Sequence, residues 1–319
     1  MAGYGLNCEE ETKFAFDRAG GEADIVHIND LIAKPKQLSE YDILVFPGGF
    51  SYGDDTGSGK AYASKFRNHL KKELEEFLAR NTLVIGICNG FQIITNLGLL
   101  PGALAHNEGG LYIDRWIDLK VTGKSPWLTG IKKISLPIAH GEGRYITNPK
   151  EYKILQKEKR IAFTYEKGEM CKYQNMKANP NGAMYDIAGV LGYNGRVLGM
   201  MPHPERAMFF TQRPDWQIKK EEMNRKKKNL PEDGAGIIIF KNAVKPRLKS
   251  AVITEDIRPP QFAQSVGLLF ALTAIVGSLT GISVIFVIAV SFALAAAFLN
   301  AAFNFCLGCE VYLLILRLR

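Results

Sequence analysis

The chain has 319 residues, 47% of them hydrophobic and 23% charged, which is enough apolar material for one large domain and a further segment. Its net charge of +8 has a local source in the polar run 219–228, where no aromatic residues interleave with the basic ones, so we expect a solvated loop or a subunit contact and no nucleic-acid binding. The 5 cysteines are irregularly spaced and the N-terminus has no signal-peptide pattern, which excludes a disulfide-rich secreted domain and favours a cytoplasmic protein.

Up to residue 249 the sequence alternates short β-branched runs with amphipathic stretches. This alternation predicts an α/β domain with a doubly wound, mostly parallel sheet that helices cover on both faces. Asn7 is the expected N-cap of the first helix. In chain order we expect a helix over 9–19, strands over 23–28 and 43–46, a helix over 60–79, a strand over 83–87, a helix over 91–97, and strands over 160–165 and 197–201.

The segment Gly86-Ile87-Cys88-Asn89-Gly90 lies between a predicted strand and a predicted helix. This is the context of a nucleophile elbow, in which glycines allow a tight, strained turn. The start of the following helix favours the thiolate form of the cysteine. A lone cysteine after a core strand would be interpreted as a buried structural residue, but the two glycines favour a nucleophile.

A cysteine nucleophile needs a base and a group that orients the base. His203 follows another predicted strand, and Glu205 lies two residues further in a segment stiffened by Pro202 and Pro204. Residues two apart in extended chain point the same way, so the Glu205 carboxylate can fix the His203 tautomer. After a third strand, Gly48 and Gly49 can turn backbone N–H groups toward a developing oxyanion.

Four motifs together resemble the glutaminase subunits of phosphoribosylformylglycinamidine synthase, a branch of the class I glutamine amidotransferases. The resemblance covers about residues 3–246, and the motifs are Pro47 to Asp54, Gly86 to Gln92, Ala139 to Tyr145, and Pro202 to Arg206. It implies a Cys88 nucleophile, a His203 base and a Glu205 orienting group. It further implies that the backbones of Gly49 and Asn89 donate to the oxyanion, that Phe50 and Gln92 help to bind glutamine, and that His140 and Glu142 lie on the substrate side or at an interface.

The resemblance also implies partners. It implies that ammonia from glutamine passes to a separate synthetase subunit, which uses ATP and Mg²⁺ to convert formylglycinamide ribonucleotide to the amidine, with a small third subunit in the complex. We expect no cofactor and no metal in this chain. Two alternatives remain, namely a class I amidotransferase for another acceptor and a membrane-anchored, inactive glutaminase-like interaction protein.

The N-terminus departs from that family pattern. Its members begin with an apolar strand before the segment that matches residues 3–12, and no such strand precedes that segment here. We therefore expect the sheet to lack its first strand and the true translation start to lie upstream of Met1.

The C-terminal region, residues 262–319, is almost wholly apolar and follows a proline-containing linker at 250–261. The runs 262–281 and 282–302 are long enough to span a bilayer, with a reversal at 277–281 and basic residues at both outer ends. We expect a transmembrane helix hairpin that tethers a cytoplasmic glutaminase domain, residues 1–249, to the inner face of the cell membrane. A buried hairpin, a gene fusion or a sequence-assembly join are the alternatives.

Cys306 and Cys309 form a CxxC motif near the end of the chain. The motif can bind a metal or cycle as a disulfide, but a lone pair lacks the four ligands of a structural zinc site. This end faintly resembles small uncharacterised bacterial membrane proteins, and its role stays open.

Overall fold

The computed structural model describes residues 1–54, 57–247 and 258–303. The chain forms two compact units, Met1–Leu248 and Lys249–Arg319. Each unit is described by itself below.

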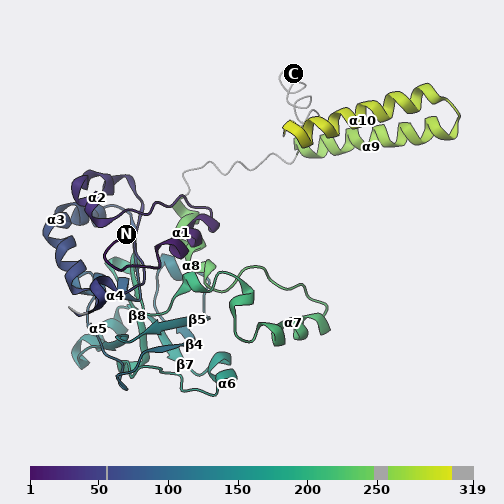
Figure 1. Cartoon of the computed structure of the whole chain (residues 1–319). Coiled ribbons are helices and arrows are strands. Elements are labelled where there is room, and N and C mark those ends of the chain that lie inside the picture. The colour runs from purple at the N-terminus through teal and green to yellow at the C-terminus, as the bar shows by residue number, and fades with distance from the viewer. Residues whose placement is uncertain (55–56, 248–257, 304–319) are drawn as a thin grey trace. The chain divides into compact units, whose positions relative to one another are not determined.

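The first unit is built around a sheet whose described strands run in the order β1-β2-β9-β8-β7-β4-β5. Figure 1 labels β4, β5, β7 and β8 of this sheet. A separate antiparallel pair, β3 with β6, lies outside this sheet. The strands are β1 (Ile43–Phe46), β2 (Leu83–Ile87), β3 (Ala103–Ala105), β4 (Ile113–Val121), β5 (Lys133–His140), β6 (Arg144–Ile146), β7 (Ile161–Glu166), β8 (Ile187–Gly192) and β9 (Val197–Met200).

The sheet is mixed, so the prediction of a mostly parallel sheet is wrong. Among the described strands of this sheet, only the pairs β1 with β2 and β2 with β9 are parallel, whereas neighbours in the series β9, β8, β7, β4 and β5 are antiparallel. For β8 and β9 the cause is connection length, because a parallel crossover needs a dozen or more residues and a short turn can only reverse the chain. The turn Tyr193–Gly195 joins β8 directly to β9.

The long helix α3 of the first unit buries one face. In α3 the apolar positions recur at helical spacing, and Tyr62, Phe66, Leu70 and Leu74 are all buried. The core below them contains Phe46 of β1, which is fully buried. The helices are α1 (Glu9–Arg18), α2 (Ile28–Ala33), α3 (Lys60–Ala79), α4 (Asn89–Asn96), α5 (Pro149–Lys157), α6 (Glu169–Gln174), α7 (Trp216–Arg225) and α8 (Ile237–Val244).

Several predicted elements shift. The expected strand 23–28 is wrong, because His27 forms only an isolated bridge with Ala2 and then caps α2 by accepting a hydrogen bond from the Asn29 backbone. Cys8, not Asn7, is the N-cap of α1, and its side chain makes no cap hydrogen bond. The helix predicted over 91–97 begins earlier, directly after Cys88.

The basic run lies mostly in a helix and not in a loop. The helix α7 covers residues 216–225, and none of its residues is buried. The prediction of a solvated segment is therefore confirmed, and the prediction of a loop is wrong for this stretch. Ion pairs within and beside the helix order it, for example Arg225 with Glu221 at 2.9 Å.

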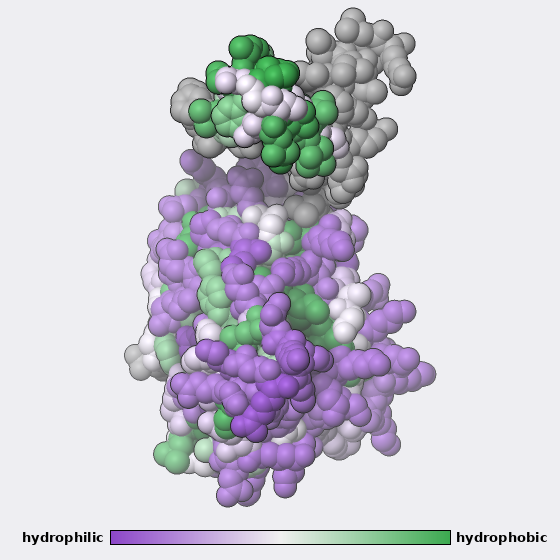
Figure 2. Space-filling model, turned by 90° about the vertical axis from the view of Figure 1, so that its right-hand side faces the viewer, coloured by the Kyte–Doolittle hydropathy of each residue, from purple (hydrophilic) through white to green (hydrophobic). Residues whose placement is uncertain are grey.

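The second unit is a pair of apolar helices, α9 (Arg258–Leu279) and α10 (Ser283–Phe303). Gly281, at φ 72°, lies in the reversal between them, at the end of the predicted segment 277–281, whose first three residues instead belong to α9. Gly277 permits close contact, since a Cβ there would lie 2.7 Å from the Phe286 backbone nitrogen. Figure 2 shows this unit in the green of hydrophobic residues, whereas the visible face of the first unit is mostly hydrophilic.

The predicted membrane spans are not found. Over the residues that the structure describes, no helix combines the length and apolarity needed to cross a membrane. Most of the predicted linker, and Cys306 with Cys309, lie outside the described residues.

Candidate active site

Cys88 lies in a strained turn between β2 and α4. Its φ of 51° is positive, which is rare for a residue with a side chain. The flanking glycines make the turn possible, because a Cβ on Gly90 would lie 1.8 Å from the Phe46 carbonyl oxygen and one on Gly86 would lie 2.5 Å from the Gly90 oxygen. The turn places the Cys88 thiol 3.6 Å from the Ala139 carbonyl oxygen at the end of β5.

His203 and Glu205 form a buried pair beside this turn. The His203 Nδ1 atom lies 2.5 Å from Glu205 Oε1, and the His203 backbone donates to the Pro137 carbonyl of β5 at 2.8 Å. Burial lowers the pKa of His203, but the charges of Glu205 and then Cys88 outweigh it and raise that pKa well above 6.5. These charges therefore favour the protonated form of His203 near the Cys88 sulfur. An imidazolium beside a cysteine favours the thiolate form.

The loop after β1 packs over the start of α4. The Asn89 side chain accepts a hydrogen bond from the Ser51 backbone at 3.1 Å and donates to Gln92 Oε1 at 2.6 Å. Gln92 in turn donates to the Glu142 backbone carbonyl at 2.6 Å. These bonds tie together three of the motifs identified in the sequence.

Gly49 follows β1 with a φ of 144°, a conformation that favours glycine. A Cβ there would lie 2.6 Å from the Gly5 carbonyl oxygen, so no side chain fits. The Phe50 backbone N–H donates to that same Gly5 oxygen at 2.8 Å. This N–H is therefore engaged within the fold and not directed at a substrate.

His140 is buried at the end of β5. Its Nδ1 atom lies 3.1 Å from Asn107 Oδ1, which also accepts the Gly143 backbone N–H. Burial, and next the charge of His203, lower the pKa of His140 to about 3, so this imidazole is neutral. Its Nε2 atom is buried and has no hydrogen-bond partner among the described residues.

The rim of the site is partly exposed. Glu142 pairs with the exposed His106 at 3.4 Å. The rings of Phe50 and Tyr112 lie 6.1 Å apart, and both side chains are exposed. Burial, and next the charge of Cys88, raise the pKa of Tyr112, which places its hydroxyl within electrostatic range of the nucleophile.

Cys8 is a site residue that sequence reasoning did not single out. The Cys8 thiol, a His203 ring nitrogen and a Glu205 carboxylate oxygen lie within 4.8 Å of one another, and all three residues are buried. Their types could ligate a metal, but Arg206 Nη2 lies 3.0 Å from the Cys8 sulfur. A fixed positive charge against the sulfur opposes a bound cation. The signal in the sequence is weak, because Cys8 is only a cysteine at the start of a helix.

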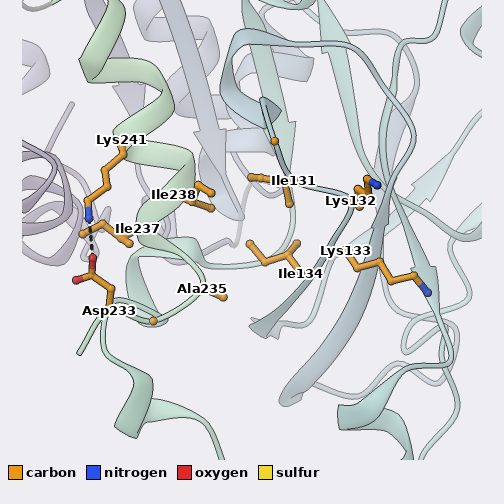
Figure 3. Close-up of a pocket in the computed structure, with 11 residues that line it drawn as sticks. Ile131, Lys132, Lys133, Ile134, Asp233, Ala235, Ile237, Ile238 and Lys241 are labelled. Atoms are coloured by element: carbon orange, nitrogen blue, oxygen red, sulfur yellow. Dashed lines mark hydrogen bonds and ion pairs between the residues drawn. The ribbon is translucent and has the colours of Figure 1, made fainter. Parts of the chain in front are cut away.

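A pocket with a volume of about 800 Å³ lies elsewhere on this unit (Figure 3). It is an open groove between α8 and the start of β5, lined by Ile131, Ile134 and Ile238. Lys241 is paired with Asp233 at 2.6 Å along one side. Since β5 enters here at Lys133 and reaches Cys88 only at its other end, this groove is separate from the candidate active site.

The structure thus brings together Cys88, His203, Glu205, the Gly49 loop, Asn89, Gln92, His140 and Glu142, which are the residues selected from the sequence. Phe50 lies at the rim. Cys8, Asn107 and Tyr112 are added by the structure. All three come from segments that carry no motif of their own.

Comparisons with known proteins agree with this geometry. The model of the CobB/CobQ-like glutamine amidotransferase domain matches residues 1–245. The phosphoribosylformylglycinamidine synthase subunit PurQ of Methanococcus maripaludis strain C5 is 48% identical over 257 residues, covering 76% of this chain and 96% of that protein. PurQ of Dehalococcoides mccartyi is 39% identical, covering 76% and 93% of the two chains.

Among solved structures, a chain of the PurLQS structure from Thermotoga maritima is similar with a TM-score of 0.55 and 29% identity, covering 77% of this chain and 96% of that one. A second family model, a domain of unknown function called DUF4395, matches residues 235–317 and hence the apolar helix pair. The first 245 residues decide the assignment, because they match along nearly the whole length of the PurQ relatives. The chain belongs to the CobB/CobQ-like glutamine amidotransferase family, within its branch of PurQ glutaminase subunits of phosphoribosylformylglycinamidine synthase.

Proposed function

We propose that this chain hydrolyses glutamine to glutamate and ammonia through Cys88, as the glutaminase subunit of a phosphoribosylformylglycinamidine synthase in purine biosynthesis. The main support for this proposal is the arrangement of three buried residues. A buried imidazole and carboxylate, His203 and Glu205, are joined at 2.5 Å beside a cysteine whose φ of 51° is that of a nucleophile elbow.

The reaction follows from these groups. The Cys88 thiolate attacks the side-chain amide carbon of glutamine, and the oxygen becomes an oxyanion near Gly49 and the start of α4. His203 gives its proton to the leaving nitrogen, which departs as ammonia and leaves a thioester. His203 then takes a proton from water, which attacks the thioester and releases glutamate. Glu205 holds the imidazole in the required orientation throughout.

The ammonia needs an acceptor subunit. We propose a synthetase subunit that holds ATP and Mg²⁺ and aminates formylglycinamide ribonucleotide, together with a small third subunit. The similarity to a chain of the PurLQS structure from Thermotoga maritima supports this assembly. We place the contact at the rim of the site, where Phe50 and Tyr112 expose aromatic rings next to the nucleophile.

We also propose the domain organisation, with the glutaminase in residues 1–249, a linker over 250–261 and a separate apolar unit in 262–319. The glutaminase unit is proposed to act in the cytoplasm. Cys8, Cys88 and Cys171 are free thiols, which fits a reducing compartment.

The test uses the full chain with its synthetase subunits. Cys88→Ala should abolish glutamate release and labelling by a glutamine-analogue alkylator, while amidine synthesis from added ammonia persists. Cys171→Ala, which also removes a buried thiol, is the matched control and should keep both activities. Undiminished glutamate release by Cys88→Ala would refute the assignment of the nucleophile. Release of glutamate without amidine synthesis would point to another acceptor.

A further inference from the structure

The base of the proposed glutaminase has a second buried thiol as its neighbour. Cys8 is fully buried, and its sulfur lies within 4.8 Å of a His203 ring nitrogen and of a Glu205 carboxylate oxygen. Gly48 makes this proximity possible, because a Cβ there would lie 2.7 Å from His203 Cε1 and 3.2 Å from the Cys8 sulfur.

The backbone of Cys8 is fixed from two directions. Its N–H donates to the Gly48 carbonyl at 3.2 Å, and its carbonyl accepts the Thr12 hydroxyl at 2.6 Å in the first turn of α1. The thiol is therefore held in place by the loop after β1 and by α1, independently of the His203 segment. A fixed acceptor of this kind can hold a long, charged side chain.

The side chain that it holds is Arg206. The guanidinium donates to the Cys8 sulfur at 3.0 Å, across 198 positions of sequence. Arg206 is adjacent in sequence to Glu205, and the carboxylate charge acts on it. Glu205 uses Oε1 for His203, while its Oε2 is buried and has no hydrogen-bond partner among the described residues. That free oxygen is the competing acceptor for the guanidinium.

We propose that Cys8 is a positioning residue, which holds the Arg206 guanidinium away from Glu205 and so reserves the carboxylate charge for His203. An arginine paired with Glu205 would neutralise the charge that keeps His203 protonated. His203 would then lose its proton at lower pH and serve less well as the acid that releases ammonia. The inference rests on the proposed glutaminase function, since it concerns the same base.

Other groups also act on His203 and must be constant in any test. They come from the segment before α1, the turn before α4, the rim, the end of β5 and the His203 turn itself. The titratable and charged residues in question are Cys8, Cys88, Tyr112, His140, Glu205 and Arg206. Only the first and the last are altered below.

The experiment titrates the His203 ring directly in the full chain, by NMR of ¹³C- and ¹⁵N-labelled histidine, with the signal assigned by its loss in His203→Gln. Cys8→Ala should lower the pKa of His203 by about one unit or more, because a positive charge then reaches its carboxylate partner. Cys8→Ser keeps an acceptor and should shift the pKa by less than half as much. Cys8→Ala with Arg206→Gln should recover most of that fall, but not the part that comes from the direct interaction of Cys8 with His203. Cys171→Ala controls for the loss of a buried thiol.

A folded Cys8→Ala variant with an unchanged His203 pKa would overturn the proposal, as would a double variant whose His203 pKa stays as low as that of Cys8→Ala. If Cys8→Ala does not fold, two other variants test the proposal. They are Cys8→Val, which is similar in size and has no acceptor, and Arg206→Gln. Arg206→Gln alone should move the pKa by less than about half a unit, since the guanidinium is already held by Cys8. A rise of a full unit would mean that Arg206 acts on Glu205 even with Cys8 present, and would also overturn the proposal.

The titration requires neither glutamine nor the synthetase, so its failure is distinct from a failure of the proposed function. As a second readout, the alkaline limb of kcat/KM for glutamine should move to lower pH with the His203 pKa in Cys8→Ala. A fall in kcat at all pH values, without movement of that limb, would indicate a merely structural role for Cys8.

Discussion

The buried, neutral His140 predicts how the stability of the first unit depends on pH. Only 2% of this residue is exposed, and burial followed by the charge of His203 lowers the pKa of its imidazole to about 3. In the unfolded chain the same group has a pKa of about 6.5. Between pH 6.5 and pH 3 the imidazole of His140 is therefore protonated in the unfolded state but not in the folded state. The free energy of unfolding falls as the pH falls through this range. Between pH 7 and pH 5 this contribution amounts to about 2 kcal/mol.

The variant His140→Gln removes the titration and keeps an amide that can donate to Asn107. Urea unfolding of the full chain at pH 7 and pH 5 gives the free energy of unfolding at each pH. We expect the loss on acidification to be smaller in His140→Gln than in the wild type by about 2 kcal/mol. His106→Gln, on the exposed rim, controls for the general effect of removing a histidine. An equal loss in wild type and His140→Gln would refute the reasoning.

Three further perturbations test other parts of the site and its support. Glu205→Gln should lower kcat for glutamine hydrolysis by about 10²–10⁴-fold, measured as glutamate release, because His203 loses its charged partner; a loss below tenfold would contradict its orienting role. Gly90→Ala should lower the free energy of unfolding by about 3 kcal/mol or more, since the new Cβ would lie 1.8 Å from the Phe46 oxygen, and a fully stable variant would show that the elbow can relax. Asp118→Ala should lower the free energy of unfolding by about 3 kcal/mol, because the buried Asp118 carboxylate accepts hydrogen bonds from the backbone N–H groups around the start of α6. Hydrogen exchange at those N–H groups should increase, and unchanged exchange there would count against this role.

The sequence sufficed for features that depend on local spacing. The strand β2, the turn at Cys88 and the start of α4 are specified by one apolar run and two glycines, and they form within a few residues of the predicted positions. The helix α3 was likewise predictable, because its apolar residues repeat at helical spacing. These features need no knowledge of distant parts of the chain.

Features set by distant contacts were not predictable in this way. Whether residues 23–28 pair as a strand depends on a neighbouring strand, and here only Ala2 bridges to His27. The contact between Cys8 and Arg206 joins segments 198 positions apart, and the sequence of neither segment indicates that the two meet. Strand direction is a further case, since it depends on how each connection runs and not on the strand's own residues.

The prediction of a mostly parallel sheet was wrong, but the site residues predicted from the strand ends still lie together. Starting from β9, each of β8, β7, β4 and β5 reverses the direction of its neighbour, so β5 again points the same way as β9. The carboxyl ends of β1, β2, β9 and β5 therefore meet at one edge of the sheet, where they deliver Gly49, Cys88, His203 and His140. The hydrogen bond from His203 to Pro137 and the contact of Cys88 with Ala139 show that β5 joins this edge directly. The carboxyl ends of two strands lie at the same edge of a sheet whenever an even number of reversals separates them. A site predicted from strand ends can therefore be correct even where the predicted strand directions are wrong.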